Sequence, residues 1–335
     1  MLVDAFVFQT IEPLRFFLFK NKEYSMISIY RKSEDGLEEV SSIQKDCWIH
    51  ILQPNYVELS EVSKALDIPE EFLTDPLDQD ERARVEVEDG YILIILRIPY
   101  LDKEHPDIPY NTAPVGIIYS EHNIVTISSM ETEILTTFVS KKLKSFSLKN
   151  KEKFIFLIFL RTAIMYLKYL RQISNMTNEI EKALHKSMKN QELIKLLDLE
   201  KSLVYITTAL KANEIMINRL AAIKKFKINA EDKDLLEDVI VEYRQAIEMS
   251  SVYSNILSGM MDAFASVISN NLNVVMKLLT SISIILMFPT LVASIYGMNV
   301  ALPFQNSPHA FLITMIIAFG ISAVGVLLFT YRRWF

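Results

Sequence analysis

The sequence predicts a mixed α/β domain, then a long helical stalk, then two C-terminal membrane-spanning helices. Three observations support this fold class. Strand-like and helical patterns alternate up to about residue 150, helical periodicity dominates beyond it, and two long uncharged segments stand near the end. We therefore expect an α/β domain over 1–150, a helical domain and stalk over 151–272, and a transmembrane domain over 273–331.

Composition excludes several classes of protein. The chain has 335 residues, with 35 Lys and Arg against 41 Asp and Glu, and a net charge of −6, which argues against a generally basic nucleic-acid binder. Hydrophobic residues make up 50%, enough apolar surface to exclude disorder as the dominant state. The single cysteine, Cys47, excludes an intrachain disulfide and a Cys-rich metal site.

The first 150 residues read as strands and helices in alternation. Runs rich in Ile, Val and Tyr and bounded by turn residues predict strands, and apolar residues at helical spacing predict two helices. The strands are expected at 26–30, 48–52, 91–98, 115–119 and 124–128, and the helices at 57–66 and 131–144. The sequence contains no Walker-type, dinucleotide-binding or HExxH motif, so nothing in this domain indicates an enzyme.

Helical periodicity then continues over 151–187, 190–225 and 230–280. Asn229, followed by Asp232, is typical of a helix N-cap with an acidic first turn. No proline follows until Pro289, which predicts one helix from about 230 to 296 with a length of roughly 100 Å. The apolar stripe of such a helix must pack on neighbouring helices or on other subunits.

Two segments are long and apolar enough to cross a membrane. Residues 278–296 and 310–331 carry no charge and would span about 28 and about 33 Å as helices, close to a hydrocarbon core of roughly 30 Å. Residues 271–335 hold three basic and no acidic side chains, whereas the first 270 hold 32 basic and 41 acidic ones. The alternative is a pair of buried helices in a soluble core.

The flanking charges predict the orientation of these spans. Lys277 precedes the first span, Arg332 and Arg333 follow the second, and the connecting loop 297–309 has no Lys or Arg. By the positive-inside rule the loop lies outside and both termini are cytoplasmic. No N-terminal signal peptide is visible. We therefore expect a multi-pass protein of the cytoplasmic membrane.

The first span ends in Tyr296-Gly297-Met298-Asn299, with a second span and a basic tail after it. In this context the motif resembles the CorA family of divalent-cation channels, in its two-helix GxN group. The resemblance covers nearly the whole chain and includes the stretches 257–260, 269–273 and 276–280. Methionine in the motif is similar to the magnesium-type members of the family.

The resemblance implies a funnel-shaped homopentamer in which Gly297, Met298 and Asn299 form the selectivity filter. Mg²⁺ prefers octahedral oxygen coordination and dehydrates reluctantly, so neutral amide and carbonyl oxygens suit a hydrated ion. Glycine at 297 is expected to allow the turn that directs the carbonyls inward. Asn299 taken alone would also fit a helix C-cap.

The same resemblance implies a pore lined by the first span. Its positions are Asn273, Met276, Leu279, Met287 and Thr290. Asn and Thr would give polar rings, and Met and Leu would form hydrophobic constrictions that gate by dewetting. Ordinary helix packing is the alternative for such an apolar stripe. An inside-negative membrane potential would drive uptake without ATP.

Gating in the family is by cytoplasmic Mg²⁺ bound between subunits, and two acids match by local sequence, Asp75 and Asp238. The alternative is that both are solvated surface acids. Ala163 stands where a third family acid is expected, which leaves a second regulatory ion open. The external loop lacks the family's Met-Pro-Glu and has no carboxylate.

Three functions follow from this sequence. Mg²⁺ transport, with Mg²⁺ both carried and regulatory, is the first; transport of Co²⁺, Ni²⁺ or Zn²⁺ by the same architecture is the second. The third is a membrane-anchored enzyme or scaffold, which predicts a conventional pocket in residues 1–145. We expect a channel and no enzyme, with partners limited to other copies of the chain, the lipid bilayer and divalent cations.

Overall fold

The computed structural model describes residues 27–33, 36–105, 107–139, 148–186, 190–304 and 306–332. The chain divides into two compact units, Met1–Ser258 and Gly259–Phe335. Parts of the predictions lie outside the described residues: the start of the strand at 26–30, the end of the helix at 131–144, and the tail residue Arg333.

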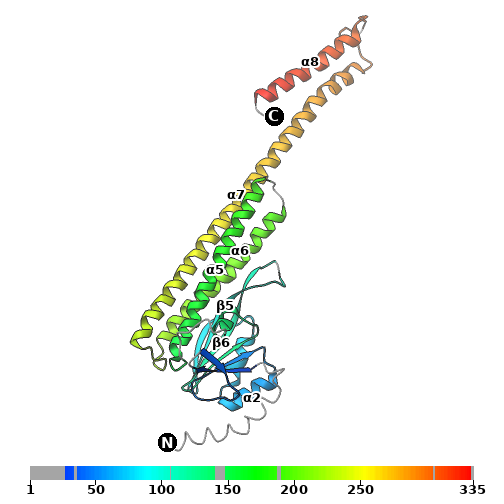
Figure 1. Ribbon diagram of the computed structural model, residues 1–335. Helices are drawn as coiled ribbons and strands as arrows, with labels where there is room; N and C mark the ends of the chain where they lie inside the picture. Colours follow the sequence, from blue (N-terminus) through cyan, green and yellow to red (C-terminus); the bar gives the residue numbers. More distant parts are fainter. Residues whose placement is uncertain are drawn as a thin grey trace, which may run out of the picture. The chain divides into compact units, whose positions relative to one another are not determined.

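The first unit is built on a seven-stranded sheet with the order β2-β1-β3-β7-β6-β5-β4. Two of its strands, β5 and β6, are labelled in Figure 1. Its strands are β1 (Ile27–Ser33), β2 (Gly36–Glu39), β3 (Cys47–Leu52), β4 (Arg84–Glu88), β5 (Tyr91–Leu101), β6 (Tyr110–Tyr119) and β7 (Ile124–Ser128). Neighbouring strands are antiparallel except for β3 and β7, which pair in parallel. All five predicted strands are present, and the short strands β2 and β4 were not predicted.

Helices cover both faces of this sheet. One face packs on α2 (Tyr56–Leu66), α3 (Glu70–Thr74) and the 3₁₀ turn η2 (Asp75–Leu77), whose Phe72 and Leu73 are buried beside Ile49 and Ile127. The other face packs on α4 (Glu133–Val139), α5 (Lys151–Lys186) and α6 (Asn190–Ala221). Because both faces are covered, the central strands are buried along most of their length rather than at alternate residues.

Aromatic residues join the sheet to the second helical layer. Trp48 of β3 makes edge contacts with Phe138 of α4 and Phe154 of α5, at ring-centroid distances of 6.5 and 5.2 Å. Its indole nitrogen donates to Thr126 Oγ1 at 2.8 Å, so the polar edge of this fully buried ring is satisfied.

One helix, α7 (Ala230–Tyr296), runs through both units, as predicted, and stays helical through Pro289. Asp232 lies in its acidic first turn, is buried, and accepts a hydrogen bond from Asn150 Nδ2 at 2.8 Å. Along the first unit α7 packs antiparallel to α6, because their contacts pair in opposite order. These are Thr207 with Ser250, Glu200 with Ser258, and Glu214 with Arg244.

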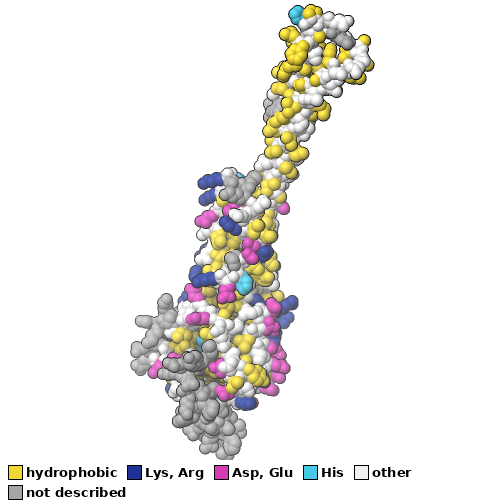
Figure 2. Space-filling model, turned by 90° about the vertical axis from the view of Figure 1, so that its right-hand side faces the viewer, with side chains coloured by type: hydrophobic (Ala, Val, Ile, Leu, Met, Phe, Trp, Pro, Cys, Tyr) yellow, Lys and Arg dark blue, Asp and Glu magenta, His cyan; other side chains and the backbone are white. Residues whose placement is uncertain are grey.

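The second unit contains the end of α7 and the helix α8 (Ala310–Tyr331), and both are long and apolar enough to cross a membrane. In the view of Figure 2, hydrophobic side chains cover this unit, whereas Lys, Arg, Asp and Glu gather on the first unit. The predicted fold class is thereby confirmed. The boundaries at 150 and 272 stay a prediction.

His50 predicts a pH dependence of folding. Its Nδ1 lies 3.0 Å from Thr126 Oγ1, and burial lowers its pKa from 6.5 to about 4. Below pH 6.5 His50 binds a proton in the unfolded chain but not in the folded one. Its contribution to the free energy of unfolding is therefore fully present above pH 6.5 and decreases as the pH falls towards 4. The loss from this group is roughly 3 kcal/mol. The unfolding temperatures at pH 7 and pH 4.5 should differ less in His50→Gln than in the wild-type protein. An equal difference in the two proteins would contradict this prediction.

Candidate functional site

The Gly-Met-Asn motif follows the C-terminal end of α7. The helix ends at Tyr296, and helical hydrogen bonds continue from Gly297 N to Ala293 O (2.9 Å) and from Met298 N to Ile295 O (3.2 Å). All three motif residues are exposed, with Met298 at 55%. Gly297 does not adopt a positive φ, and the expected turn that directs its carbonyls inward stays a prediction. What favours glycine there is space, because a Cβ would lie 3.3 Å from Ala293 O.

The five predicted pore positions share one face of α7. At about 100° per residue they fall within an arc of about 120°, which we call the Asn273 face. It is formed by Asn273, Met276, Leu279, Met287 and Thr290, and each side chain is exposed in the described chain. The exposed fractions of the three apolar residues are large: 52% for Met276, 58% for Leu279 and 65% for Met287.

The opposite face of α7 packs against α8. It consists of Ser281, Ile285, Phe288 and Val292, and its centre lies about 150° from that of the Asn273 face. Ser281 is fully buried, and Ser322 Oγ of α8 donates to Ile285 O at 3.4 Å. A Cβ at Gly325 would lie 3.1 Å from the Phe288 ring. Ala318 and Gly325, with Ser322 between them, are small residues that allow close contact between the two helices.

Three further hydroxyl residues lie on the Asn273 face and were missed by the sequence reasoning. They are Thr280, Ser283 and Ser294, all exposed. Ser283 Oγ donates to Leu279 O at 2.9 Å and Thr290 Oγ1 to Leu286 O at 3.2 Å, which leaves the lone pairs of each hydroxyl oxygen for other partners. All three lie at helical spacing from Thr290, and this pattern in the sequence would have placed them on the same face.

A cavity lies beside the motif, between the end of α7, the loop that follows it and the start of α8. It has a volume of about 410 Å³ and is lined mostly by apolar residues, among them Tyr296, Met298, Leu302, Phe311 and Met315. Tyr296 OH donates to Pro303 O at 3.4 Å, which ties the end of α7 to the loop.

Asp75 is held in place by its surroundings. It opens η2, and the next residue, Pro76, is buried against β6 so closely that a Cβ at Gly116 would lie 2.4 Å from the proline ring. Arg97 of β5 donates to Gln79 O at 3.0 Å and to Glu81 O at 2.7 Å, which fastens the chain that follows. The Asp75 carboxylate therefore has a fixed position on the domain.

The Asp75 carboxylate has a cationic partner. Arg84 Nη2 lies 2.7 Å from Asp75 Oδ2, and the same guanidinium also contacts Glu81, and Glu86 at 3.3 Å. The pKa of Arg84 is raised: burial acts to lower it, but the hydrogen bond to Asp75 and the charge of Glu81 outweigh that effect.

Asp238 lies on α7 with an exposed side chain, next to the fully buried Val239. Within the described residues no hydrogen bond or ion pair joins it to Asp75, and no group of three His, Cys, Asp or Glu side chains is placed to hold a metal ion. In the part of the chain that the structure describes, neither Asp75 nor Asp238 belongs to a complete metal site. Ala163 is fully buried in α5.

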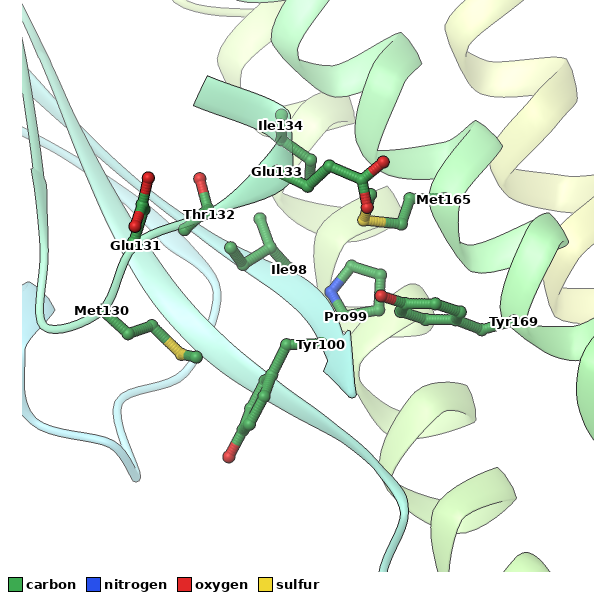
Figure 3. Close-up of a pocket in the computed structure, with 10 residues that line it drawn as sticks. All are labelled: Ile98, Pro99, Tyr100, Met130, Glu131, Thr132, Glu133, Ile134, Met165 and Tyr169. Atoms are coloured by element: carbon green, nitrogen blue, oxygen red, sulfur yellow. The ribbon is translucent and has the colours of Figure 1, made fainter. Parts of the chain in front are cut away.

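The α/β domain contains a small cavity of about 40 Å³ between β5, the segment before α4, and α5 (Figure 3). Tyr169 lies beside Pro99 at one side, and Met130, Glu131 and Thr132 lie at the other. This space suits water molecules rather than a substrate, so this cavity does not support the enzyme alternative.

Comparison with known proteins gives consistent matches over nearly the whole chain. The family model described as "CorA-like Mg2+ transporter protein" matches residues 44–333. The "Cobalt/magnesium transport protein CorA" of Methanocaldococcus jannaschii is 28% identical over 92% of this chain and 100% of its own length. The protein of the same name from Thermotoga maritima is 22% identical over 78% of this chain and 75% of its own length.

Solved structures agree with this. The complete structure of the CorA magnesium transporter from Methanocaldococcus jannaschii has a TM-score of 0.81 and 26% identity, covering 93% of this chain and 99% of that one. The full-length CmaX protein has a TM-score of 0.70 over 92% of this chain and 97% of that one; at 14% identity this shows the fold alone.

Proposed function

The chain belongs to the CorA-like Mg²⁺ transporter family, and we propose that it carries Mg²⁺ across the cytoplasmic membrane through a homopentameric pore. In this proposal the Asn273 face of α7 lines the pore, and Gly297, Met298 and Asn299 form its outer filter. The loop 297–309 lies outside and both termini are cytoplasmic, in keeping with the flanking Lys277, Arg332 and Arg333.

The observation that carries the proposal is the division of α7 into two faces. One face packs on α8 through Ser281, Phe288 and Val292, and the other exposes Asn273 and Thr290. In a bilayer, polar side chains face protein or water rather than lipid tails. A ring of copies with α7 innermost places the Asn273 face around a central water-filled path, and α8 outside it.

The filter chemistry suits a hydrated divalent cation. Mg²⁺ gives up its bound water molecules reluctantly. A ring of Asn299 amide and carbonyl oxygens can accept hydrogen bonds from these water molecules. Below it, Met287, Leu279 and Met276 form narrow apolar rings that close the path by dewetting. An inside-negative potential of 100 mV stabilises an inward-moving divalent ion by about 4.6 kcal/mol, so no ATP is needed.

Cytoplasmic Mg²⁺ gates the pore in this proposal. Asp75 and Asp238 are hard oxygen ligands, one partly exposed and one exposed, and each is incomplete as a metal site within one chain. Mg²⁺ bound between copies would neutralise their repulsion and stabilise the closed ring. Loss of the ion then favours opening, because an ion stabilises the state that binds it better.

The functional test is rescue of growth. A bacterial strain without its own Mg²⁺ uptake systems should grow at low Mg²⁺ when it expresses this chain, and should not grow with Asn299→Ala at equal membrane abundance. Equal growth with both chains, or no rescue by an inserted wild-type protein, would refute the proposal. Co²⁺ is the second candidate ion, favoured by the cobalt in the names of two relatives; Co²⁺ sensitivity of the same strain tests it.

The two faces of α7 also give a prediction on accessibility. With Cys47 replaced by Ser, we expect Thr290→Cys to react with a water-soluble thiol reagent in sealed vesicles, because it faces the proposed aqueous path. Ser281→Cys is the matched control on the face against α8 and should react at least about tenfold more slowly, since a buried thiol is inert. Equal reactivity of the two, measured by mass shift, would contradict the assignment of the pore face.

A further inference from the structure

We propose that Arg84 is a built-in competitor of Mg²⁺ at Asp75, and that it sets the Mg²⁺ concentration at which this carboxylate binds the ion. The inference rests on the gating role proposed for Asp75 and adds to it a residue that determines the affinity. It starts from the ion pair between the two side chains, with Nη2 and Oδ2 2.7 Å apart.

The cluster around Arg84 has more negative than positive charge. One guanidinium is shared by the carboxylates of Asp75, Glu81 and Glu86. The local sum is therefore −2, which attracts a divalent cation. Arg84 is bonded to Asp75 Oδ2, and its positive charge beside this carboxylate opposes the approach of a second cation, so the ion and the guanidinium compete for Asp75.

Of the two partners, Arg84 is the one free to move. The segment that carries Asp75 is held by Pro76 against Gly116 and by the bonds of Arg97 to the backbone at residues 79 and 81. Arg84, in contrast, lies on β4, the edge strand of the sheet, and reaches its partners at the end of a long side chain with many rotamers. Exchange thus proceeds by rotation of the arginine rather than by movement of the loop.

Arg84 also keeps partners when it leaves Asp75. Glu86 lies two residues further along the same strand, on the same side, and Glu81 contacts the other guanidinium nitrogen. The guanidinium therefore stays paired while Mg²⁺ occupies Asp75. Such an exchange costs little, so that the Mg²⁺ concentration can decide which cation is bound.

The test is a titration of the full-length protein in detergent with MgCl₂, which measures the concentration that gives half-maximal protection against chymotrypsin. This protease does not cleave at arginine, so the substitutions do not change its cleavage sites. Removing one unit charge next to a divalent ion changes its affinity roughly tenfold at a water-exposed site. We expect the midpoint for MgCl₂ in Arg84→Gln to fall by about that factor. Arg84→Lys keeps the charge but loses the planar set of guanidinium donors that bonds several carboxylates at once. Its MgCl₂ midpoint should therefore lie between the midpoints of the wild type and of Arg84→Gln.

Arg82→Gln is the matched control. Arg82 is exposed, lies two positions earlier, and makes no ion pair within the described residues. The same loss of charge there should move the midpoint by less than about twofold because of screening. In an Asp75→Asn background the effect of Arg84→Gln should disappear, since the contested carboxylate is gone.

The outcomes separate the inference from the gating proposal. No Mg²⁺ protection of the wild-type protein overturns both. Protection of the wild type with equal midpoints in Arg84→Gln and Arg82→Gln overturns the inference alone, as does an undiminished Arg84→Gln effect in the Asp75→Asn background. Should Arg84→Gln fail to fold by circular dichroism, Arg84→Lys decides, and a midpoint not below that of wild type overturns the inference.

Discussion

Asn299→Ala is expected to abolish Mg²⁺ transport while the protein still folds, inserts and assembles. Each copy loses one amide group from the proposed filter, and a hydrogen bond contributes about 1 kcal/mol. In the proposed pentamer five such losses act on one ion, so that we expect flux to fall roughly a hundredfold or more. The side chain of Asn299 is exposed, so its removal leaves no buried cavity.

The matched control is Asn306→Ala. Asn306 is an exposed asparagine of the same loop, seven residues beyond the motif. Its loss should leave Mg²⁺ flux within about twofold of wild type, as for most exposed polar changes. Flux into vesicles, corrected for the amount of inserted protein, measures both variants. Normal flux with Asn299→Ala, or equal loss in the two variants, would show that Asn299 has no special role.

Asp238→Asn is expected to weaken the response to cytoplasmic Mg²⁺. The variant keeps the shape of the side chain but removes one unit charge from each copy, which at about 4 Å from a divalent ion corresponds to about 2 kcal/mol in water. The Mg²⁺ concentration that inhibits flux should rise roughly tenfold or more, and the channel should stay active at internal Mg²⁺ levels that close the wild type.

Glu237→Gln provides the control for charge alone. Glu237 is the adjacent exposed acid, turned about 100° away around α7. Patch recording or dye flux at stepped internal Mg²⁺ should give a wild-type midpoint for Glu237→Gln and a raised one for Asp238→Asn. If the two midpoints coincide, Asp238 is a solvated surface acid, as the alternative held.

Much of the fold could be predicted because long elements carry strong local signals. The central strands β5 and β7 are mostly apolar and rich in β-branched residues, and α7 has a 67-residue stretch in which Pro289 is the sole proline. The edge strands β2 and β4 were missed. They are short and rich in charge, GLEE and RVEVE, as edge strands often are, so that pairing rather than composition defines them.

The end of α6 shows another limit of sequence patterns. Helical periodicity predicted a helix to residue 225, but α6 ends at Ala221. The reason is Phe226, which is buried against Tyr119 and Phe156 at ring distances of 5.3 and 5.7 Å. An apolar residue that continues the helical pattern here anchors a loop instead, a distinction that depends on tertiary packing.

The candidate site was predictable in part. The spacing of the proposed pore residues was enough to place them on one helix face. Their roles in a pore came from the family resemblance, and these roles remain proposals. Neither the packing of Ser281 and Phe288 on α8 nor the pairing of Arg84 with Asp75 could be read from the sequence. Both require the structure, because they depend on segments brought together by folding.

The most direct test of the central claim is Mg²⁺ uptake by sealed proteoliposomes that contain the purified protein and a Mg²⁺-sensitive dye. An inside-negative potential should drive uptake, and removal of the potential should slow it, since the potential supplies the driving force for a divalent ion. No uptake of Mg²⁺ at any potential, by a folded and inserted protein, would contradict the account.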